Sequence, residues 1–179
     1  WISTLFVLAG LKSAQSPVHL LRNMLPAYFT ALGTMSSAAT IPVSLQATKS
    51  NGVNVDIANF TVPLFATTHL SGSTITIVSC ALAVITMHNG LEIPSLLTML
   101  PFIFMLGIVM LAAPGVPGGA VMSAVGLLGT MLGFDETALA LMIALYLAQD
   151  SFGTACNVTC DGALAVMLDA AENQDAADQ

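Results

Sequence analysis

The chain alternates between long apolar stretches and short segments that are polar or rich in glycine and proline. The apolar stretches predict helical segments over residues 1–11, 18–50, 54–88, 92–133 and 135–168, and an acidic tail follows over residues 169–179. Three stretches are interrupted, at Ser36–Thr40, His69–Ser73 and Pro114–Gly119. The last stretch starts with Asp135 and Glu136, and acidic residues favour the first turn of a helix. We therefore expect an all-helical protein with three broken stretches, a continuous last helix and a disordered tail.

The order of these segments repeats along the chain. An interrupted apolar stretch is followed by a longer helix with polar residues in its middle, and the same pair then occurs again. Bare backbone at membrane depth costs several kcal/mol for each unsatisfied group, so it is tolerated only where it is buried or lines a cavity. Breaks at matching positions of two halves are typical of transporters built from inverted repeats. The order therefore predicts an inverted repeat of a re-entrant hairpin followed by a broken or polar transmembrane helix.

The composition of the chain places this repeat in a membrane. Of its 179 residues, 56% are hydrophobic and only 7% are charged, whereas soluble domains carry about 25% charged residues. A chain with so few charges cannot cover a globule with solvated side chains, so we expect a multi-pass protein of the lipid bilayer. The strong cations are Lys12, Arg22 and Lys49 alone, which argues against binding to nucleic acid.

A stripe of polar residues runs along the last apolar helix. Asp150, Thr154, Asn157 and Asp161 are spaced so that they lie within roughly 60° of one another on one helix face. A charge at the centre of a bilayer costs about 2.5 to 3.5 kcal/mol on insertion scales. Each acid therefore needs a cation, a donor or water. Because the strong cations of the chain lie elsewhere, we expect the compensating charge to come from an ion, a proton or a cationic group on a substrate.

Each of these polar residues also has a structural interpretation. A threonine such as Thr154 often forms hydrogen bonds between membrane helices, and Ser36 and Ser37 could be packing residues. A single histidine such as His69 is more often a hydrogen-bonded structural residue than a ligand. For the two acids of the stripe the structural interpretation is weaker, because ionisable groups cost more to bury.

Four motifs resemble those of the dicarboxylate/amino acid:cation symporters, the family of glutamate and neutral amino acid transporters. SSAATIP (36–42) resembles the serine-rich tip of the first re-entrant hairpin, and VPLFATTHLSGST (62–74) resembles the segment with the family's Asn-Met-Asp-Gly break. AAPGVPGGA (112–120) resembles the tip of the second hairpin, the gate, and QDSFGTACNVTCDG (149–162) resembles the substrate and sodium helix. The resemblance covers residues 1–168, the transport-domain half of such a protein, and it is stronger to the bacterial serine/threonine branch than to the glutamate branch.

The resemblance implies a substrate site at these breaks. Asp150 matches the acid that receives the α-ammonium group of the substrate. Asn157 matches the amide that holds the α-carboxylate, together with backbone near Ser36 and Ser37. The implied substrate-binding residues are Ser36, Ser37, Ser73, Pro114, Gly115, Asp150, Thr154 and Asn157.

The resemblance also implies coupling to a cation, which is Na⁺ or, as the alternative, H⁺. Asp161 matches the acid of one sodium site, and Thr67 with the backbone of 111–113 matches a second. Hard oxygen ligands suit such an ion. The implied cation-binding residues are Phe65, Thr67, His69, Asn157 and Asp161.

Three departures from the family pattern change the expected substrate and ions. Gly153 stands where members with acidic substrates carry an arginine, and Met35 stands where some members carry another. A second carboxylate is best held by a bidentate arginine, so the expected substrate is a small neutral amino acid. Ser71 replaces the aspartate of a third sodium site. We therefore expect fewer coupled sodium ions, and a proton at His69 could replace one of them because imidazole titrates near neutral pH.

These inferences predict a secondary active symporter rather than an enzyme, which imports a serine-, threonine- or alanine-like amino acid across the plasma membrane, the inner membrane of a bacterium. Because the chain begins inside an apolar run, at Trp1, we interpret it as a fragment of a longer protein that forms a homotrimer. A symporter for dicarboxylates or acidic amino acids and an inactive structural fragment are the alternatives. A hydrolase that uses Ser36, His69 and Asp161 is disfavoured, because no motif positions a nucleophile.

Overall fold

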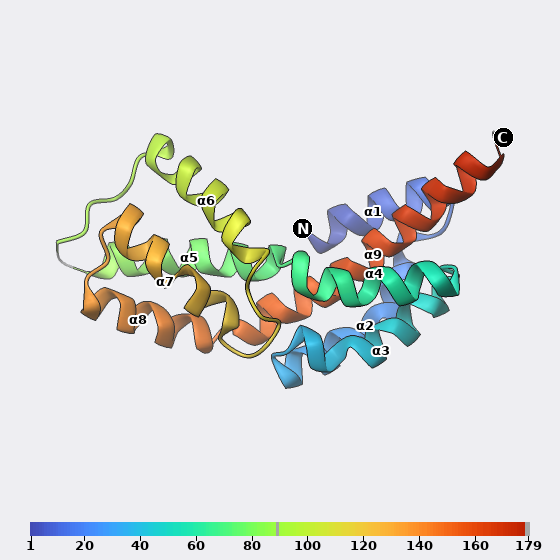
Figure 1. The fold of residues 1–179 in the computed structure, drawn as a ribbon, viewed down its shortest axis with the longest axis horizontal. Helices are drawn as coiled ribbons and strands as arrows, with labels where there is room; N and C mark the ends of the chain where they lie inside the picture. Colours follow the sequence, from blue (N-terminus) through green and yellow to red (C-terminus); the bar gives the residue numbers. More distant parts are fainter. Residues whose placement is uncertain (89, 178–179) are drawn as a thin grey trace.

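The computed structural model describes residues 1–88 and 90–177, and this part of the chain is all-helical, as the sequence predicts. Its helices are α1 (Ile2–Ser13), α2 (Pro17–Thr34), α3 (Ser37–Ser50), α4 (Val55–Thr68), α5 (Ser71–Met87), α6 (Leu96–Met110), α7 (Gly119–Leu132), α8 (Glu136–Leu147) and α9 (Asp150–Ala177). Figure 1 shows an elongated molecule in which α5–α8 form one end, α1–α4 form the other, and α9 runs from the middle to the C-terminus.

Two helical hairpins, α2–α3 and α6–α7, point their tips toward the middle of the molecule (Figure 1). The first tip turns at Met35, which has a left-handed φ of 52°, and Ser36 then caps α3 by accepting a hydrogen bond from the Ala39 N–H. The second tip turns at Gly118, whose φ is 74°. A glycine adopts this conformation at no steric cost, whereas a methionine rarely does. The first tip is a tight turn, whereas the second is the longer segment 111–118, and both bring backbone groups to the middle of the molecule.

Each hairpin is followed by a pair of helices separated by a short break. Helix α4 ends at Thr68 and α5 starts at Ser71, so the first break is His69–Leu70. Helices α8 and α9 are bent by 57° at Ala148–Gln149. Within this break the Gln149 N–H bonds the Tyr146 carbonyl, three residues earlier, at 2.9 Å, which makes a tighter turn than that of an α-helix. The order of hairpin and broken helix therefore occurs twice along the chain.

Two expectations for the C-terminal part differ from the structure. The sequence predicts one continuous helix over 135–168, but a break separates α8 from α9, and neither glycine nor proline marks it. The predicted disordered tail over 169–179 is helical to Ala177, and residues 178–179 lie outside the described part. The tail is rich in alanine, a strong helix former, and the Asp169 carboxylate accepts a hydrogen bond from the Asn54 N–H at 2.8 Å. This bond ties the start of the tail to the N-terminus of α4.

The apolar core is divided into two clusters, one at each end of the molecule. One cluster joins α5, α6, α7 and α8 around fully buried side chains such as Phe102 and Tyr146. The other joins α1, α2 and α3 to α9 around Phe6 and Met24. The region between them holds the hairpin tips, both helix breaks and the polar stripe of α9. Packing at the two ends thus fixes the position of a polar centre.

Helices α5 and α9 approach each other closely at this centre, where a glycine of each helix lies in the contact. A Cβ atom on Gly72 would lie 2.4 Å from the Gly153 carbonyl oxygen and 2.6 Å from Cβ of Cys156. A Cβ atom on Gly153 would lie 3.3 Å from the backbone of Ser73. The two glycines let the start of α5 rest directly on the backbone of α9.

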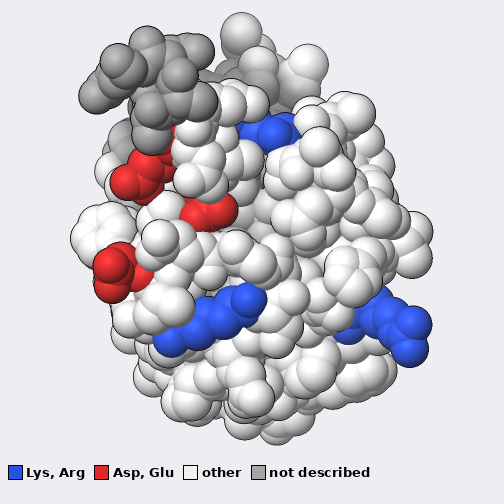
Figure 2. Space-filling model, turned by 90° about the vertical axis from the view of Figure 1, so that its right-hand side faces the viewer, with Lys and Arg blue, Asp and Glu red and all other residues white. Residues whose placement is uncertain are grey.

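The surface agrees with a membrane environment. Helices α4 and α5 together form a segment of 33 residues, Val55–Met87, that is long and apolar enough to cross a bilayer, and the bent pair α8–α9 forms another if it is counted as one span. Large apolar side chains are exposed on α6, including Leu97 and Phe104. Figure 2 views the end of the molecule where α9 finishes and shows a few charged groups on an otherwise uncharged face.

We expect Gly72→Ala to destabilise the protein by about 1–3 kcal/mol, because the new methyl group overpacks the contact between α5 and α9. Thermal unfolding of the detergent-solubilised protein measures the loss. Gly126→Ala in α7 is the matched control, since no atom lies within 4 Å of its added Cβ, and it should be neutral or slightly stabilising. An unchanged melting temperature for Gly72→Ala would contradict the close approach.

Candidate functional site between the hairpin tips and helix α9

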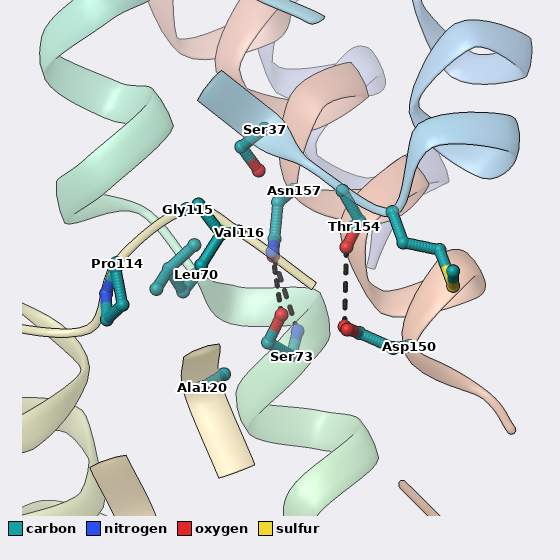
Figure 3. A pocket seen from close by; sticks show the side chains of 11 residues that line it. Ser37, Leu70, Ser73, Pro114, Gly115, Val116, Ala120, Asp150, Thr154 and Asn157 are labelled. Atoms are coloured by element: carbon teal, nitrogen blue, oxygen red, sulfur yellow. Dashed lines mark hydrogen bonds between the residues drawn. The ribbon is translucent and has the colours of Figure 1, made fainter. Parts of the chain in front are cut away.

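A narrow cavity lies where both hairpin tips meet the start of α5 and the polar face of α9 (Figure 3). Its space for the centres of water molecules is about 10 Å³, which is room for about one water molecule. The lining residues are Met35, Ser37, Leu70, Ser73, Pro114, Gly115, Val116, Ala120, Asp150, Thr154 and Asn157. Four separate elements therefore contribute its walls.

Asp150 is the one charged residue that lines this cavity, and it is only 3% exposed. As the first residue of α9 it lies at a helix N-terminus, where a negative charge is stabilised. Its Oδ2 accepts a hydrogen bond from the Gly118 N–H at 2.7 Å. Its Oδ1 accepts one from the Tyr146 hydroxyl at 3.0 Å and a longer one from Thr154 at 3.4 Å. The carboxylate is thus held by neutral donors from three elements.

Asn157 lies two turns further along α9 and is also buried. Its Oδ1 accepts hydrogen bonds from the N–H groups of Gly72 at 2.7 Å and Ser73 at 3.3 Å, buried amides that have no partner within the first turn of α5. Its Nδ2 donates to the Ser73 hydroxyl at 2.8 Å, and Figure 3 shows this pairing across the cavity. The amide is therefore fixed in orientation, with its NH₂ group turned toward a hydroxyl oxygen that a ligand oxygen could replace.

The two hairpin tips are bonded to each other above the cavity. The Gly115 carbonyl accepts a hydrogen bond from the Ser36 hydroxyl at 2.8 Å and another from the Ala38 N–H at 3.2 Å. A Cβ atom on Gly115 would lie 3.0 Å from the Ala66 carbonyl oxygen, so the tip also rests against the end of α4. The joined tips leave room for only about one water molecule between them and α9, so a larger molecule can bind there only if one of them moves.

A second polar pair lies at the break between α4 and α5. Nδ1 of His69 and Oδ1 of Asp161 are 2.8 Å apart; the Asp161 side chain is 2% exposed and the His69 side chain 19%. Beside it, the indole N–H of Trp1 donates to the Ser71 hydroxyl at 2.8 Å. The imidazole therefore contacts the carboxylate that the family resemblance assigns to a cation.

The structure brings together most of the residues that were predicted for the substrate. All of them line the cavity except Ser36, whose hydroxyl bonds the tips above it. The residues that were predicted to bind cations lie less close to one another. His69 contacts Asp161, and the Phe65 carbonyl accepts the His69 N–H at 2.9 Å, but the Thr67 hydroxyl bonds the Leu64 carbonyl in an exposed turn of α4. In the described part of the chain, no three His, Cys, Asp or Glu side chains are placed to hold a metal ion, so carbonyl and amide oxygens would have to complete a cation site.

Sequence reasoning missed two donors to Asp150. Tyr146 stands one helical turn before Asp150, so it extends the polar stripe upstream, and this signal is present in the sequence. Gly118 contributes a backbone N–H, which no side-chain pattern reveals. Gly153, where an arginine was considered, does not line the cavity, because it is covered by the close contact with Ser73.

Comparisons with known proteins match nearly the whole chain. The model of the sodium:dicarboxylate symporter family matches residues 1–171. The serine/threonine transporter SstT of Acinetobacter baumannii is 32% identical over 173 residues, which are 94% of this chain and 42% of that protein. The protein of the same name from Acinetobacter baylyi is 33% identical over 146 residues, which are 79% of this chain and 36% of the relative.

The chain thus spans less than half the length of these relatives. The match agrees with the resemblance carried by the four motifs, and it places the chain among integral membrane transporters rather than enzymes. The chain belongs to the sodium:dicarboxylate symporter family.

Proposed function

We propose that the full-length protein is a secondary active symporter that imports a small neutral amino acid, of the serine, threonine or alanine kind, together with a cation. One observation carries this proposal: a single buried acid, Asp150, faces the same cavity as a single buried amide, Asn157, and none of its lining residues is lysine or arginine. A zwitterion needs an anion for its ammonium group and donors for its carboxylate. A second carboxylate would need a fixed cation.

In the proposed binding step the substrate takes over bonds that the protein makes to itself. The ammonium group binds Asp150 and replaces the Gly118 N–H at Oδ2. The carboxylate binds the Asn157 NH₂ group, which now bonds Ser73, and backbone near Ser36 and Ser37 assists it. Thr154 and Ser73 remain as uncharged polar groups for the side chain of the substrate. The second hairpin, with Pro114 and Gly115 at its tip, is the gate that must open. Its Gly115 carbonyl is bonded to the first tip and its Gly118 N–H is bonded to Asp150, so both bonds must break when a substrate enters.

The proposed cation site is centred on Asp161, with Asn157 and backbone carbonyls near Phe65 and His69 as further ligands. Na⁺ is the favoured ion because the donors are hard oxygens, and H⁺ is the alternative. A second site at Thr67 is part of the proposal. The contact between His69 and Asp161 supports competition between the imidazole and the ion for one carboxylate.

The rest of the proposal concerns the protein in its membrane. The repeated order of hairpin and broken helix supports an inverted repeat whose halves are α2–α5 and α6–α9. We propose a homotrimer in the plasma membrane, the inner membrane of a bacterium. The relatives named as serine/threonine transporters support the choice of substrate, whereas the name of the family favours a dicarboxylate.

Serine should bind the full-length protein about 100-fold or more tightly than aspartate, because the second carboxylate of aspartate would be buried without a cation. Competition against labelled serine in proteoliposomes measures the ratio. Tighter binding of aspartate than of serine would show that the symporter carries acidic substrates, and binding of neither would favour an inactive protein.

The same assay with two arginine variants locates the determinant of charge selectivity. Met35 lines the cavity and is 36% exposed, so Met35→Arg should raise the affinity for aspartate relative to serine. Gly153→Arg should instead lower the yield of folded protein, since its Cβ would lie 3.3 Å from the backbone of Ser73. A well-folded Gly153→Arg protein that prefers aspartate would contradict this assignment.

Asp150→Asn should weaken serine binding by about 100-fold or more, because it removes the charge that the ammonium group needs. The amide oxygen can still accept from the Gly118 N–H, and the amide NH₂ group can donate to the Tyr146 hydroxyl oxygen, so folding should be retained. Asp135→Asn is the matched control, because Asp135 caps α8 and its side chain is 61% exposed. The affinity of this variant for serine should differ from that of the wild type by less than about twofold. Calorimetric titration with serine gives both values, and equal affinities would make Asp150 a structural residue.

His69→Asn should bind Na⁺ about tenfold more tightly than the wild type, because the ion no longer displaces a hydrogen-bonded imidazole from Asp161. His88→Asn at the C-terminal end of α5 serves as the control. Reversal potentials of serine-loaded proteoliposomes, under separate sodium and pH gradients, identify the coupling ion and its stoichiometry. Three sodium ions per serine in the wild type, with an unchanged sodium affinity in His69→Asn, would be evidence against the competition.

A further inference from the structure

Tyr146 has no role in the proposed binding step, yet it makes the shorter of the two side-chain hydrogen bonds to Asp150. Its hydroxyl donates to Oδ1 at 3.0 Å, against 3.4 Å for Thr154. Tyr146 is fully buried at 0% exposure, in the last turn of α8, and it is not among the residues that line the cavity. It therefore acts on the site through Asp150 rather than through contact with a ligand.

The bond crosses the break between α8 and α9. Tyr146 precedes Ala148–Gln149 and Asp150 follows it, so the two partners belong to helices that are bent by 57°. The ring of Tyr146 is packed in the apolar cluster of α5–α8, which fixes the hydroxyl in space. A carboxylate at a helix start can otherwise rotate about its side-chain bonds. The buried ring thus holds one oxygen of Asp150 at a set position relative to α8.

The backbone N–H of Gly118, the third donor to Asp150, lies on a different element from Tyr146. Gly118 belongs to the tip of the second hairpin, and it donates to the other oxygen, Oδ2. When the tip moves to admit a substrate, the bond from Gly118 must break. The bond from Tyr146 lies within the α8–α9 pair and need not change. One oxygen of Asp150 therefore has a permanent partner and the other an exchangeable one.

We propose that Tyr146 is a positioning residue of the ammonium site: its hydroxyl keeps Asp150 in one orientation while the Gly118 N–H gives way to the substrate. This inference rests on the proposed function of Asp150. Without the hydroxyl, Oδ1 retains only the longer bond from Thr154, and the carboxylate must be ordered anew each time a substrate binds. The cost of this ordering appears in the affinity for amino acid and not in the rate of the loaded carrier.

The test compares Tyr146→Phe with Tyr28→Phe in the full-length protein. Both variants lose one phenolic hydroxyl and keep the ring, and these are the two tyrosines of the chain. Tyr28 lies on α2 and packs edge-on against Phe29, with ring centroids 5.4 Å apart. Calorimetry at saturating Na⁺ gives the dissociation constant for serine. Uptake into proteoliposomes gives KM and the maximal rate, and thermal unfolding reports on packing.

Tyr146→Phe should bind serine about 10- to 100-fold more weakly, the range for a hydrogen bond to a charged group, with a raised KM and an unchanged maximal rate. Tyr28→Phe should match the wild type. Equal affinities for Tyr146→Phe and Tyr28→Phe would overturn the inference while leaving the proposed function intact. A weaker affinity that is accompanied by an equal fall in the maximal rate and in the melting temperature would also overturn it, because it indicates lost packing. A wild-type protein that binds no amino acid would remove the proposed function, and the inference with it.

Discussion

A carboxylate that is buried at membrane depth must have partners, and helix α9 carries two such groups. Asp150 and Asp161 are 3% and 2% exposed, and the strong cations of the chain lie at the distant ends of α1, α2 and α3. The structure meets this requirement with its own donors. Asp150 receives a backbone amide and two hydroxyl groups, and Asp161 receives the imidazole of His69. Among these partners, the Gly118 amide and the His69 imidazole are the two that a cation would replace in the proposed function, whereas the Tyr146 hydroxyl stays in place.

The breaks in the helices follow from the same requirement. A continuous helix consumes its own amides and carbonyls, so it has none to offer to a buried side chain. The start of α5 offers the amides of Gly72 and Ser73 to Asn157, and the tip of the second hairpin offers the amide of Gly118 to Asp150. The glycine contact between α5 and α9 brings these amides within reach. The apolar clusters at both ends hold the breaks in place, so the polar centre depends on packing that lies some distance from it.

The sequence predicts the parts of this arrangement that side chains mark. The small-polar and glycine–proline segments located both hairpin tips and the first helix break, and the spacing of the acids located the polar face of α9. The break at Ala148–Gln149 was missed, because the surrounding residues are ordinary helix formers and neither glycine nor proline marks the bend. The contact between His69 and Asp161 joins residues 92 positions apart, and no local pattern encodes it. The donor role of Gly118 depends on its backbone alone. Tyr146 was the one recognisable donor that sequence reasoning overlooked, since a single tyrosine in an apolar helix fits core packing equally well.

In the proposed symporter, the bonds at the Gly115 carbonyl bear on the direction of flux. Both tips are joined to each other directly, by two hydrogen bonds that lie over a cavity with room for about one water molecule. A carrier that closes only when it holds a solute can only exchange one solute molecule for another, because it cannot return to the other side of the membrane empty. A carrier that also closes when empty can return alone, and each cycle then moves solute in one direction. If the protein is a symporter as proposed, these two hydrogen bonds between its own tips would help it to close while empty, and so would favour net accumulation over exchange.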